Sequence, residues 1–340
     1  MNKGTKEFIG DFCILGSNYF QMPETTSEKT NHFSIGFYNL ENLFDTVDDP
    51  ETLDDDFTEF SDKKWNEKRF REKIRKLGRV ISNIGYRDIK HPPVLLGVAE
   101  VENAGVLDAL VTSKFLKKKG YGYVHFDSPD ERGIDTALLY RKEYFSVVKK
   151  ETFTVYLTDE TGERDYTRDI LYVHGLLEDQ SLHILINHWP SRRKGTKDTE
   201  HKRIAASERN LEIIERIYEE EVDPKVVIMG DFNDDPQSES IKRLMTRRFY
   251  NPMEVLLTKY EGTLSHKGKW HLFDQIIISH NFLLGHDNPF QYKSANIFSP
   301  DDIKEYKGKY KGLPFRTYGG KKYLGGFSDH FPVYSIFTVD

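Results

Sequence analysis

The sequence has almost no cysteine and no hydrophobic segment long enough to span a membrane. Cys13 is the one cysteine among 340 residues, which excludes an intramolecular disulfide framework and a cysteine-based zinc site. A transmembrane helix needs about 20 consecutive apolar residues. The longest apolar runs, such as the one in Lys225–Gly230, have only the length of a strand. The patch Phe12–Leu15 is too short for the core of a signal peptide.

The sequence also lacks an excess of positive charge. Its 49 Lys and Arg residues stand against 55 Asp and Glu residues, which gives a formal net charge of −6. This balance argues against affinity of the whole surface for nucleic acid or an anionic membrane, but it is compatible with a local basic patch. Without a signal peptide the default expectation is a cytoplasmic protein, or a secreted one if the N-terminus is truncated or mis-assigned. The sequence predicts no oligomeric state.

Hydrophobic residues nevertheless make up 37% of the chain, which is enough for a sizeable core. Apolar residues at steps of three to five predict long helices over Lys64–Ile84 and Thr199–Glu220. Continuous apolar runs predict buried strands at Val94–Val101, Thr136–Arg141 and Lys225–Gly230. Many strands with few long helices favour an α+β fold of two packed sheets covered by helices.

We expect the folded domain to span residues 32–340. The preceding segment, Met1–Asn31, mixes Lys, Glu, Gly and Thr, and we interpret it as a disordered leader, a mis-assigned start or a remnant of an expression vector. Near the other end, Asp301–Gly326 contains seven glycines or prolines and is predicted to be a long loop.

Polar side chains recur where the predicted strands begin or end. One such carboxylate is usually a turn residue or a cap, but five places together favour a site held by the rigid ends of a sheet. Glu100 is the most informative, because a carboxylate that closes an apolar strand needs a cation or a strong hydrogen-bond donor. The five places hold Asn39, Glu100, Asp231 with Asn233, Asp274, and Asp329 with His330.

These residue types offer oxygen ligands, without thiolates and with few histidines. Such a set selects a hard cation, Mg²⁺ or Mn²⁺. Mg²⁺ in proteins is held by one or two carboxylates, and its other ligands are water and phosphate oxygens. The composition of the predicted site therefore indicates phosphate-ester chemistry.

Six motifs then carry a resemblance that covers residues 33 to about 338. NLENLFD, GVAEVEN, RGIDTALLYR, NHWPSRR, GDFNDDP and FSDHFPV follow one another in the order seen in the endonuclease/exonuclease/phosphatase superfamily, and they look most similar to a bacterial branch of it. Each motif alone is moderately specific, whereas the ordered set is strongly specific. The resemblance implies the deoxyribonuclease I-like fold, a four-layer α/β/β/α sandwich of two packed mixed sheets in a single domain.

The resemblance also implies roles for individual residues around a metal ion. Asn39, Glu100 and Asp329 match the metal-linked positions of the superfamily. Asp231 and Asn233 match its GDxN pair, which positions the scissile phosphate and the attacking water or stabilises the oxyanion. Glu41 is additional to the Asn motif, and we interpret it either as a group that orients Asn39 or Glu100 or as an ordinary loop residue.

Two histidines complete the implied site. His330 matches the catalytic histidine and Asp274 its orienting carboxylate. His188 matches the second histidine of the deoxyribonuclease I and sphingomyelinase branches, and Asp135 matches its acidic partner. The two expected dyads, Asp274–His330 and Asp135–His188, would act as base and acid on opposite sides of one phosphorus. Which histidine is the base stays open.

A basic run follows His188 and contains Arg192 and Arg193. Its ordinary role would be a solvated entry to a helix, where Asp198 and Glu200 partly offset the charge. In a functional role, the run would bind substrate phosphates at the rim of the site.

The function predicted from the sequence is Mg²⁺-dependent or Mn²⁺-dependent hydrolysis of a phosphodiester of DNA or RNA, as in an endonuclease. Two alternatives remain. One is a lipid or small-molecule phosphoesterase that resembles sphingomyelinases or inositol-polyphosphate phosphatases. The other is a non-catalytic binding module of the same fold.

Overall fold

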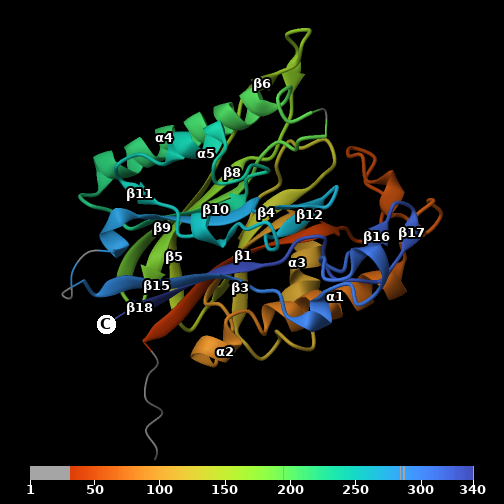
Figure 1. The fold of residues 1–340 in the computed structure, drawn as a ribbon, viewed down its shortest axis with the longest axis horizontal. Coiled ribbons are helices and arrows are strands. Elements are labelled where there is room, and N and C mark those ends of the chain that lie inside the picture. The colour runs from red at the N-terminus through yellow and green to blue at the C-terminus, as the bar shows by residue number, and fades with distance from the viewer. Residues whose placement is uncertain (1–30, 194, 284, 286–287, 340) are drawn as a thin grey trace, which may run out of the picture. The chain divides into compact units, whose positions relative to one another are not determined.

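The computed structural model describes residues 31–193, 195–283, 285 and 288–339, so the predicted leader lies outside the described residues except for Asn31. Two six-stranded sheets pack face to face and carry helices on their outer faces (Figure 1). None of the helices in the described part of the chain combines the length and the apolar character needed to cross a membrane.

The first sheet joins segments from the two ends of the domain. β1 runs parallel to β2 and antiparallel to β18, so the sheet is mixed. The pairing with β18 brings Asn39 close to the loop that carries His330, and Ser328 Oγ donates to the Asn39 carbonyl at 2.7 Å. The strand order is β15 (Phe290–Ile297), β18 (Val333–Val339), β1 (His32–Leu43), β2 (Leu95–Val101), β4 (Asp135–Arg141) and β3 (Tyr121–His125).

The second sheet is also mixed, because β9 and β10 are parallel and β10 and β14 are antiparallel. In its register, Asp231 at the end of β10 lies between His188 on β9 and Asp274 on β14. Three predicted site residues are therefore neighbours at one edge of this sheet. The strand order is β11 (Phe249–Tyr250), β14 (Asp274–Ser279), β10 (Val226–Asp231), β9 (Gln180–His188), β8 (Ile170–Leu177) and β5 (Phe145–Phe153).

The helices complete the four layers, and the predicted α/β/β/α architecture is confirmed. α1 (Glu67–Ile81) and α3 (Ala104–Val111) pack on the outer face of the first sheet. α4 (Glu200–Glu220) and α5 (Glu239–Leu244) cover the outer face of the second sheet. A third cluster of buried side chains fills the space between the sheets. Shorter elements are α2 (Tyr86–Ile89), β6 (Leu157–Thr158), β7 (Arg164–Asp165), β12 (Leu264–His266), β13 (Lys269–His271), β16 (Tyr318–Gly319) and β17 (Lys322–Tyr323).

Two parts of the C-terminal region differ from what the sequence pattern indicates. β15 is an edge strand of mixed polarity, so it carries no continuous apolar run that would mark it as a strand. The predicted loop Asp301–Gly326 contains the short hairpin β16–β17 and two 3₁₀ turns. Its glycines and prolines indicate the turns but not the pairing between them.

A buried ion pair connects α4 to the GDFNDDP loop. Arg203 is fully buried, and its Nε lies 2.8 Å from Asp234 Oδ2. Its Nη1 and Nη2 donate to the Thr199 hydroxyl and the Thr196 carbonyl, each at 2.8 Å. Asp234 is also bonded by Arg192. This arrangement fixes the loop that follows β10 against the helix above it.

We predict that Arg203→Leu lowers the free energy of unfolding by about 3 kcal/mol, because the Asp234 carboxylate would stay buried without one of its cations. Arg243→Leu is the matched control, since Arg243 pairs with Glu208 at the exposed surface and should change stability by less than about 1 kcal/mol. Urea unfolding of the two variants measures the difference, and equal midpoints would contradict the assignment.

Candidate active site

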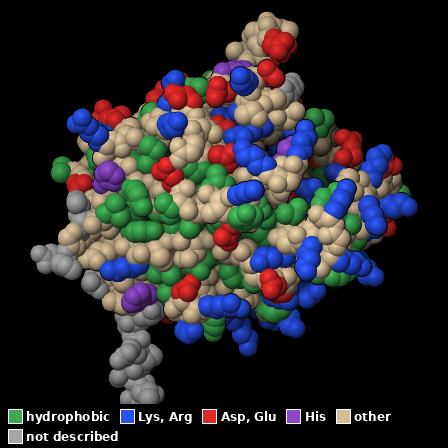
Figure 2. All heavy atoms as spheres, viewed as in Figure 1, with side chains coloured by type: hydrophobic (Ala, Val, Ile, Leu, Met, Phe, Trp, Pro, Cys, Tyr) green, Lys and Arg blue, Asp and Glu red, His purple; other side chains and the backbone are tan. Residues whose placement is uncertain are grey.

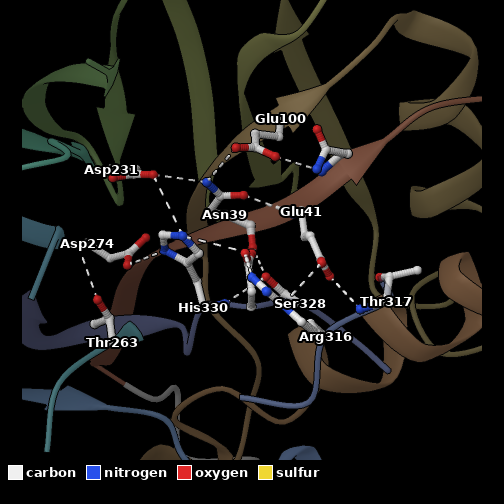
Figure 3. A network of polar contacts seen from close by, with 12 residues as sticks. Asn39, Glu41, Glu100, Asp231, Thr263, Asp274, Arg316, Thr317, Ser328 and His330 are labelled. Carbon is white, nitrogen blue, oxygen red and sulfur yellow. Dashed lines mark hydrogen bonds and ion pairs between the residues drawn. The ribbon is translucent and has the colours of Figure 1, made fainter. Parts of the chain in front are cut away.

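A single amide joins carboxylates from the two sheets. Asn39 Nδ2 donates to Asp231 Oδ2 at 3.0 Å and to Glu100 Oε1 at 3.3 Å (Figure 3). Asn39 Oδ1 accepts the Glu41 N–H at 2.9 Å, which orients the amide with its NH₂ toward the carboxylates. The metal-linked role that the resemblance implies for Asn39 stays a prediction. In the structure, its side chain holds the two acidic groups together as a hydrogen-bond donor.

The backbone around these groups departs from regular strand geometry. Glu100 has φ +61°, and Glu41 and Asn42 on the neighbouring strand have φ +52° and +50°. The pairing of β1 with β2 shifts register at this point. Left-handed conformations are unfavourable for residues other than glycine, so the surrounding contacts must hold them. One such contact is the hydrogen bond from the Asn42 N–H to Glu100 Oε2 at 2.8 Å, which aims the carboxylate into the site.

His330 and Asp274 form the first of the predicted dyads. His330 Nδ1 lies 2.7 Å from Asp274 Oδ2, and both side chains are buried. Its Nε2 lies 4.0 Å from Asp231 Oδ2 and 3.9 Å from Asp329 Oδ1. Burial opposes protonation of the imidazole, but Asp274, Asp231 and Asp329 together raise the pKa of His330 well above its usual value. These three carboxylates thus favour the cationic form of His330.

Asp231 lies between this dyad and Asn39. Its Oδ1 accepts the Asn233 N–H at 2.9 Å, and Asn233 itself has φ +51°. Burial, with Asp274 adding to it and His330 opposing it, raises the pKa of Asp231 to about 6. Asn233 Nδ2 donates to the Trp189 carbonyl at 2.9 Å. The GDxN turn is thus fixed on both sides of the carboxylate.

The second predicted dyad is wrong in its acidic partner. Asp135 Oδ2 lies 2.9 Å from His125 Nε2, and its Oδ1 accepts the Ser128 N–H at 2.9 Å. Asp135 shares its strand face with Ala137, which packs beneath the helices of the first sheet. His188 shares its face with Ile186, between the two sheets. Alternation of side chains along a strand therefore places the two groups on different faces of their sheets.

His188 instead stands beside the central carboxylates. Its Nε2 lies 3.7 Å from Asp231 Oδ2 and 3.8 Å from Glu100 Oε1. Its buried Nδ1 has no hydrogen-bond partner among the described residues. Burial, reinforced by Arg168 and Arg132, lowers the pKa of His188 well below its usual value. His188 is thus a neutral imidazole, in contrast to His330.

Asp329 forms an ion pair with Arg316, and the sequence does not predict this pairing. Arg316 donates from Nη2 to Asp329 Oδ2. Although burial would raise it, the pKa of Asp329 lies below its usual range because His330 and Arg316 are cationic neighbours. The metal-linked role of Asp329 stays a prediction, and its carboxylate is shared with Arg316.

Glu41 belongs to the same network. Its Oε2 accepts the Thr317 N–H at 2.6 Å, and the Lys73 ammonium contacts its carbonyl and the Thr317 hydroxyl. Burial and Asp329 raise the pKa of Glu41 to about 7. Through its side chain, Glu41 ties β1 to the segment before β16. Its backbone N–H orients the Asn39 amide, which favours the interpretation of Glu41 as a group that orients Asn39 over that of an ordinary loop residue.

The polar groups line a cavity of about 650 Å³ whose floor is acidic and whose rim is basic. Arg132 is half-buried at this rim, and the sequence analysis missed it although it stands inside the RGIDTALLYR motif. The lining includes Glu100, Asp231, His188 and His330 together with Arg132, Arg192, Arg193, His266, Lys267 and His271.

The two arginines of the basic run differ in what they contact. Arg192 Nε donates to the Asn233 carbonyl at 2.6 Å and to Asp234 Oδ1 at 3.0 Å, and its guanidinium stacks 4.6 Å from the Phe273 ring centroid. Arg192 therefore supports the GDxN turn. Arg193 is exposed and lines the cavity, so it is the better candidate of the two for contact with a substrate phosphate.

The donor set fits a hard divalent cation. Glu100 and Asp231 converge from two sheets, and desolvation has raised the pKa of Asp231, which a cation beside it would reverse. Asp274 and His330 lie close enough to Asp231 for the three to share a metal, but His330 uses Nδ1 for Asp274. Asp274 Oδ1 is buried with no partner among the described residues. Of these carboxylates, Glu100 and Asp231 line the cavity, so they are placed to hold an ion there.

Solved structures share this fold at low sequence identity. An endonuclease/exonuclease/phosphatase family protein from Bacteroides thetaiotaomicron is 17% identical, with a TM-score of 0.56 over 91% of this chain and 95% of that chain. Truncated TDP2 from Caenorhabditis elegans is 16% identical, with a TM-score of 0.57 over 91% and 98%. A mannosyl-6-phosphatase from Bacteroides thetaiotaomicron is 15% identical, with a TM-score of 0.54 over 90% and 99%.

No curated protein matches the sequence. Residues 34–338, however, match the sequence profile described as the Endonuclease/Exonuclease/phosphatase family. This match spans nearly all of the described residues and agrees with the fold. The chain therefore belongs to the Endonuclease/Exonuclease/phosphatase family.

Proposed function

We propose that this protein hydrolyses a phosphate ester with the help of a divalent cation, Mg²⁺ or Mn²⁺. The observation that carries the proposal is the convergence of Glu100 and Asp231, from different sheets, on one amide beside the His330–Asp274 dyad. A binding module would not need an oriented histidine, because binding makes no demand on which ring nitrogen carries the proton. The non-catalytic alternative is therefore disfavoured.

Glu100 and Asp231 would hold the cation. When bound, it would neutralise negative charge that develops on the phosphoryl oxygens and the leaving group. Asp231 and Asn233 would orient the attacking water and one phosphoryl oxygen. Asp274 accepts the Nδ1–H of His330 and leaves Nε2 facing the cavity, where it can accept a proton when the ring is neutral or donate one to the substrate when the ring is cationic. Neutral His188, beside both carboxylates, can donate a second hydrogen bond or accept a proton.

We propose a nucleic-acid phosphodiester as the substrate class. The local charge supports it: Arg132, Arg193 and Lys267 line the rim of the cavity. Figure 2 shows further Lys and Arg side chains gathered on the side of the molecule that carries α1 and the β16–β17 hairpin. TDP2 from D. rerio, 15% identical with a TM-score of 0.53 over 91% of this chain and the whole of that one, has been solved with a single-strand DNA product.

A small phosphorylated molecule is the second candidate. The cavity of about 650 Å³ has the size of a small-ligand pocket, and its basic rim would suit a sugar phosphate as well as a nucleotide. The mannosyl-6-phosphatase among the similar structures favours the same alternative. Nothing in the structure adds support for a lipid substrate.

The metal requirement gives the first test. Chelation with EDTA should abolish hydrolysis of bis-p-nitrophenyl phosphate, and Mg²⁺ or Mn²⁺ should restore it. Glu100→Gln and Asp231→Asn keep the shape of each side chain but remove its charge, so each should lower kcat by about 10²–10⁴-fold. Asp159→Asn, at an exposed loop, is the matched control and should retain full activity. Activity that survives both EDTA and Asp231→Asn would rule out the proposed site.

The two acidic partners give a second test. Asp274→Asn should lower kcat by about 10²–10⁴-fold, because the amide stabilises the wrong tautomer of His330 and no longer supports its positive charge. Asp135→Asn should lower kcat by less than about tenfold, since Asp135 contacts His125 rather than His188. Steady-state kinetics on the same substrate compare the two variants. If Asp135→Asn lowered kcat as much as Asp274→Asn, Asp135 would act in catalysis, and its separation from His188 in this structure would not hold in the active enzyme.

The substrate class gives a third test. A nucleic-acid substrate predicts a KM that rises steeply with salt, and Arg193→Ala should raise KM for single-stranded DNA and reduce that salt dependence. Arg247→Ala, at the exposed far end of the second sheet, should change neither. Hydrolysis rates for DNA, RNA and sugar phosphates between 50 and 200 mM salt provide the measurement. Preference for a sugar phosphate, with little salt dependence, would favour the second candidate.

A further inference from the structure

A second group of ligand-type side chains lies outside the candidate active site. His174 on β8 and His183 on β9 are directly opposite each other in the antiparallel register. Their rings stack with centroids 4.3 Å apart and planes 3° from parallel. Glu221, the residue that ends α4, reaches the same place, and its Oε2 lies 3.0 Å from His183 Nε2. Two imidazoles and one carboxylate thus meet between the second sheet and its covering helix.

The three groups converge closely enough to share one ion. One ligand atom from each lies within 4.8 Å of the other two. The Ser181 hydroxyl sits among them, 3.1 Å from His174 Nε2 and 3.1 Å from Glu221 Oε2. Ligand atoms around a tetrahedral Zn²⁺ are about 3.3 Å apart, since each bond is about 2.0–2.2 Å long. His174 and Glu221 are partly exposed, so their side chains are not locked by packing on every side.

His183 is already held as a metal ligand would be. It is 4% exposed, and its Nδ1 lies 2.8 Å from Tyr172 Oη. A metal-binding histidine commonly uses its other nitrogen for a fixed hydrogen bond of this kind, which sets the tautomer. Burial, with His174 adding to it and Glu221 opposing it, lowers the pKa of His183. The neutral form of His183, which is the form that binds a metal, is thereby favoured.

We propose that His174, His183 and Glu221 form a binding site for a transition-metal cation of the Zn²⁺ class, with its remaining position open to water. The ligand types support this class, because two imidazoles and one carboxylate suit Zn²⁺ and are a poor set for Mg²⁺. The site would fasten the end of α4 to β8 and β9.

This site is separate from the candidate active site. His183 and His188 stand five residues apart on β9, which is about 16 Å along the strand. An odd separation also turns the two side chains to opposite faces of the sheet. Leu185, on the His183 face, packs under α4, whereas Ile184 and Ile186, on the His188 face, pack between the sheets. Binding at the two places can therefore be measured independently.

The test titrates Zn²⁺ alone into untagged, chelator-stripped full-length protein carrying Glu100→Gln and Asp231→Asn, which removes the candidate catalytic metal ligands. Calorimetry should find one bound equivalent. Adding His174→Ala or Glu221→Gln should weaken binding by at least about tenfold. Adding His201→Ala, at an exposed position on α4, should leave the affinity unchanged. No binding in the starting protein, or equal affinity in all variants, would overturn the proposal.

A spectroscopic readout covers the case in which a variant folds poorly. Co²⁺ in place of Zn²⁺ should give visible absorption bands of a four- or five-coordinate site in the protein with intact His174, His183 and Glu221. His174→Gln keeps a polar side chain at the half-exposed position, and it should lose these bands. Its thermal unfolding in the absence of metal, followed by circular dichroism, should match that of the parent protein. Unchanged bands in His174→Gln, or bands of a six-coordinate ion in the parent, would contradict the assignment.

Discussion

The structure depends on holding two carboxylates from different sheets beside one amide. Asp231 is buried and Glu100 is partly exposed beside the same amide, and two carboxylates held this close require hydrogen-bond donors and a rigid frame to keep them there. The buried cluster between the sheets sets their separation. The pairing of β1 with β2 and of β9 with β10 and β14 then sets which side chains reach the shared edge. The left-handed backbone at Glu100 and Asn233 is tolerated for the same reason, because it aims polar groups that regular strands would turn away.

The two histidines show how position within this frame determines chemistry. His330 is surrounded by carboxylates on three sides and is protonated, whereas His188 has arginines behind it and is neutral. The Nε2 atoms of His188 and His330 lie 3.7 Å and 4.0 Å from Asp231 Oδ2. Two identical side chains thus differ in charge because of the elements that pack behind them. A phosphate placed between them would meet a proton donor on one side and a neutral imidazole on the other, an arrangement suited to moving a proton across a reacting ester.

The sequence predicts the sandwich, the long helices and the strand ends that carry Asn39, Glu100, Asp231, Asp274 and His330. It does so because apolar runs report burial directly, and because the ends of adjacent strands share one edge of a sheet. It predicts the Asp274–His330 pair but not the surroundings of His188: the Asp135–His188 pairing fails because strand alternation places the two on different faces. The Arg316–Asp329 pair joins a glycine-rich segment to a strand end, and no periodicity reports such a contact. Arg132 stands three residues before Asp135 in the RGIDTALLYR motif, and no periodicity in the sequence marks it as a residue of the cavity rim.

The net charge of the chain says little about its substrate, and the structure explains why. Several of the acidic residues in the total are buried in the site or beneath it, among them Glu41, Asp231, Asp234 and Asp274, so they contribute little to the field that an approaching molecule meets. Arg203 and Arg192 are likewise paired with Asp234, so their charges are offset by its carboxylate. Arg132, Arg193 and Lys267 are different, because they line the mouth of the cavity. A substrate would therefore be recognised by these few cationic side chains at the rim. An anionic ester can contact them and, through a divalent cation, can also bind the acidic residues beneath them.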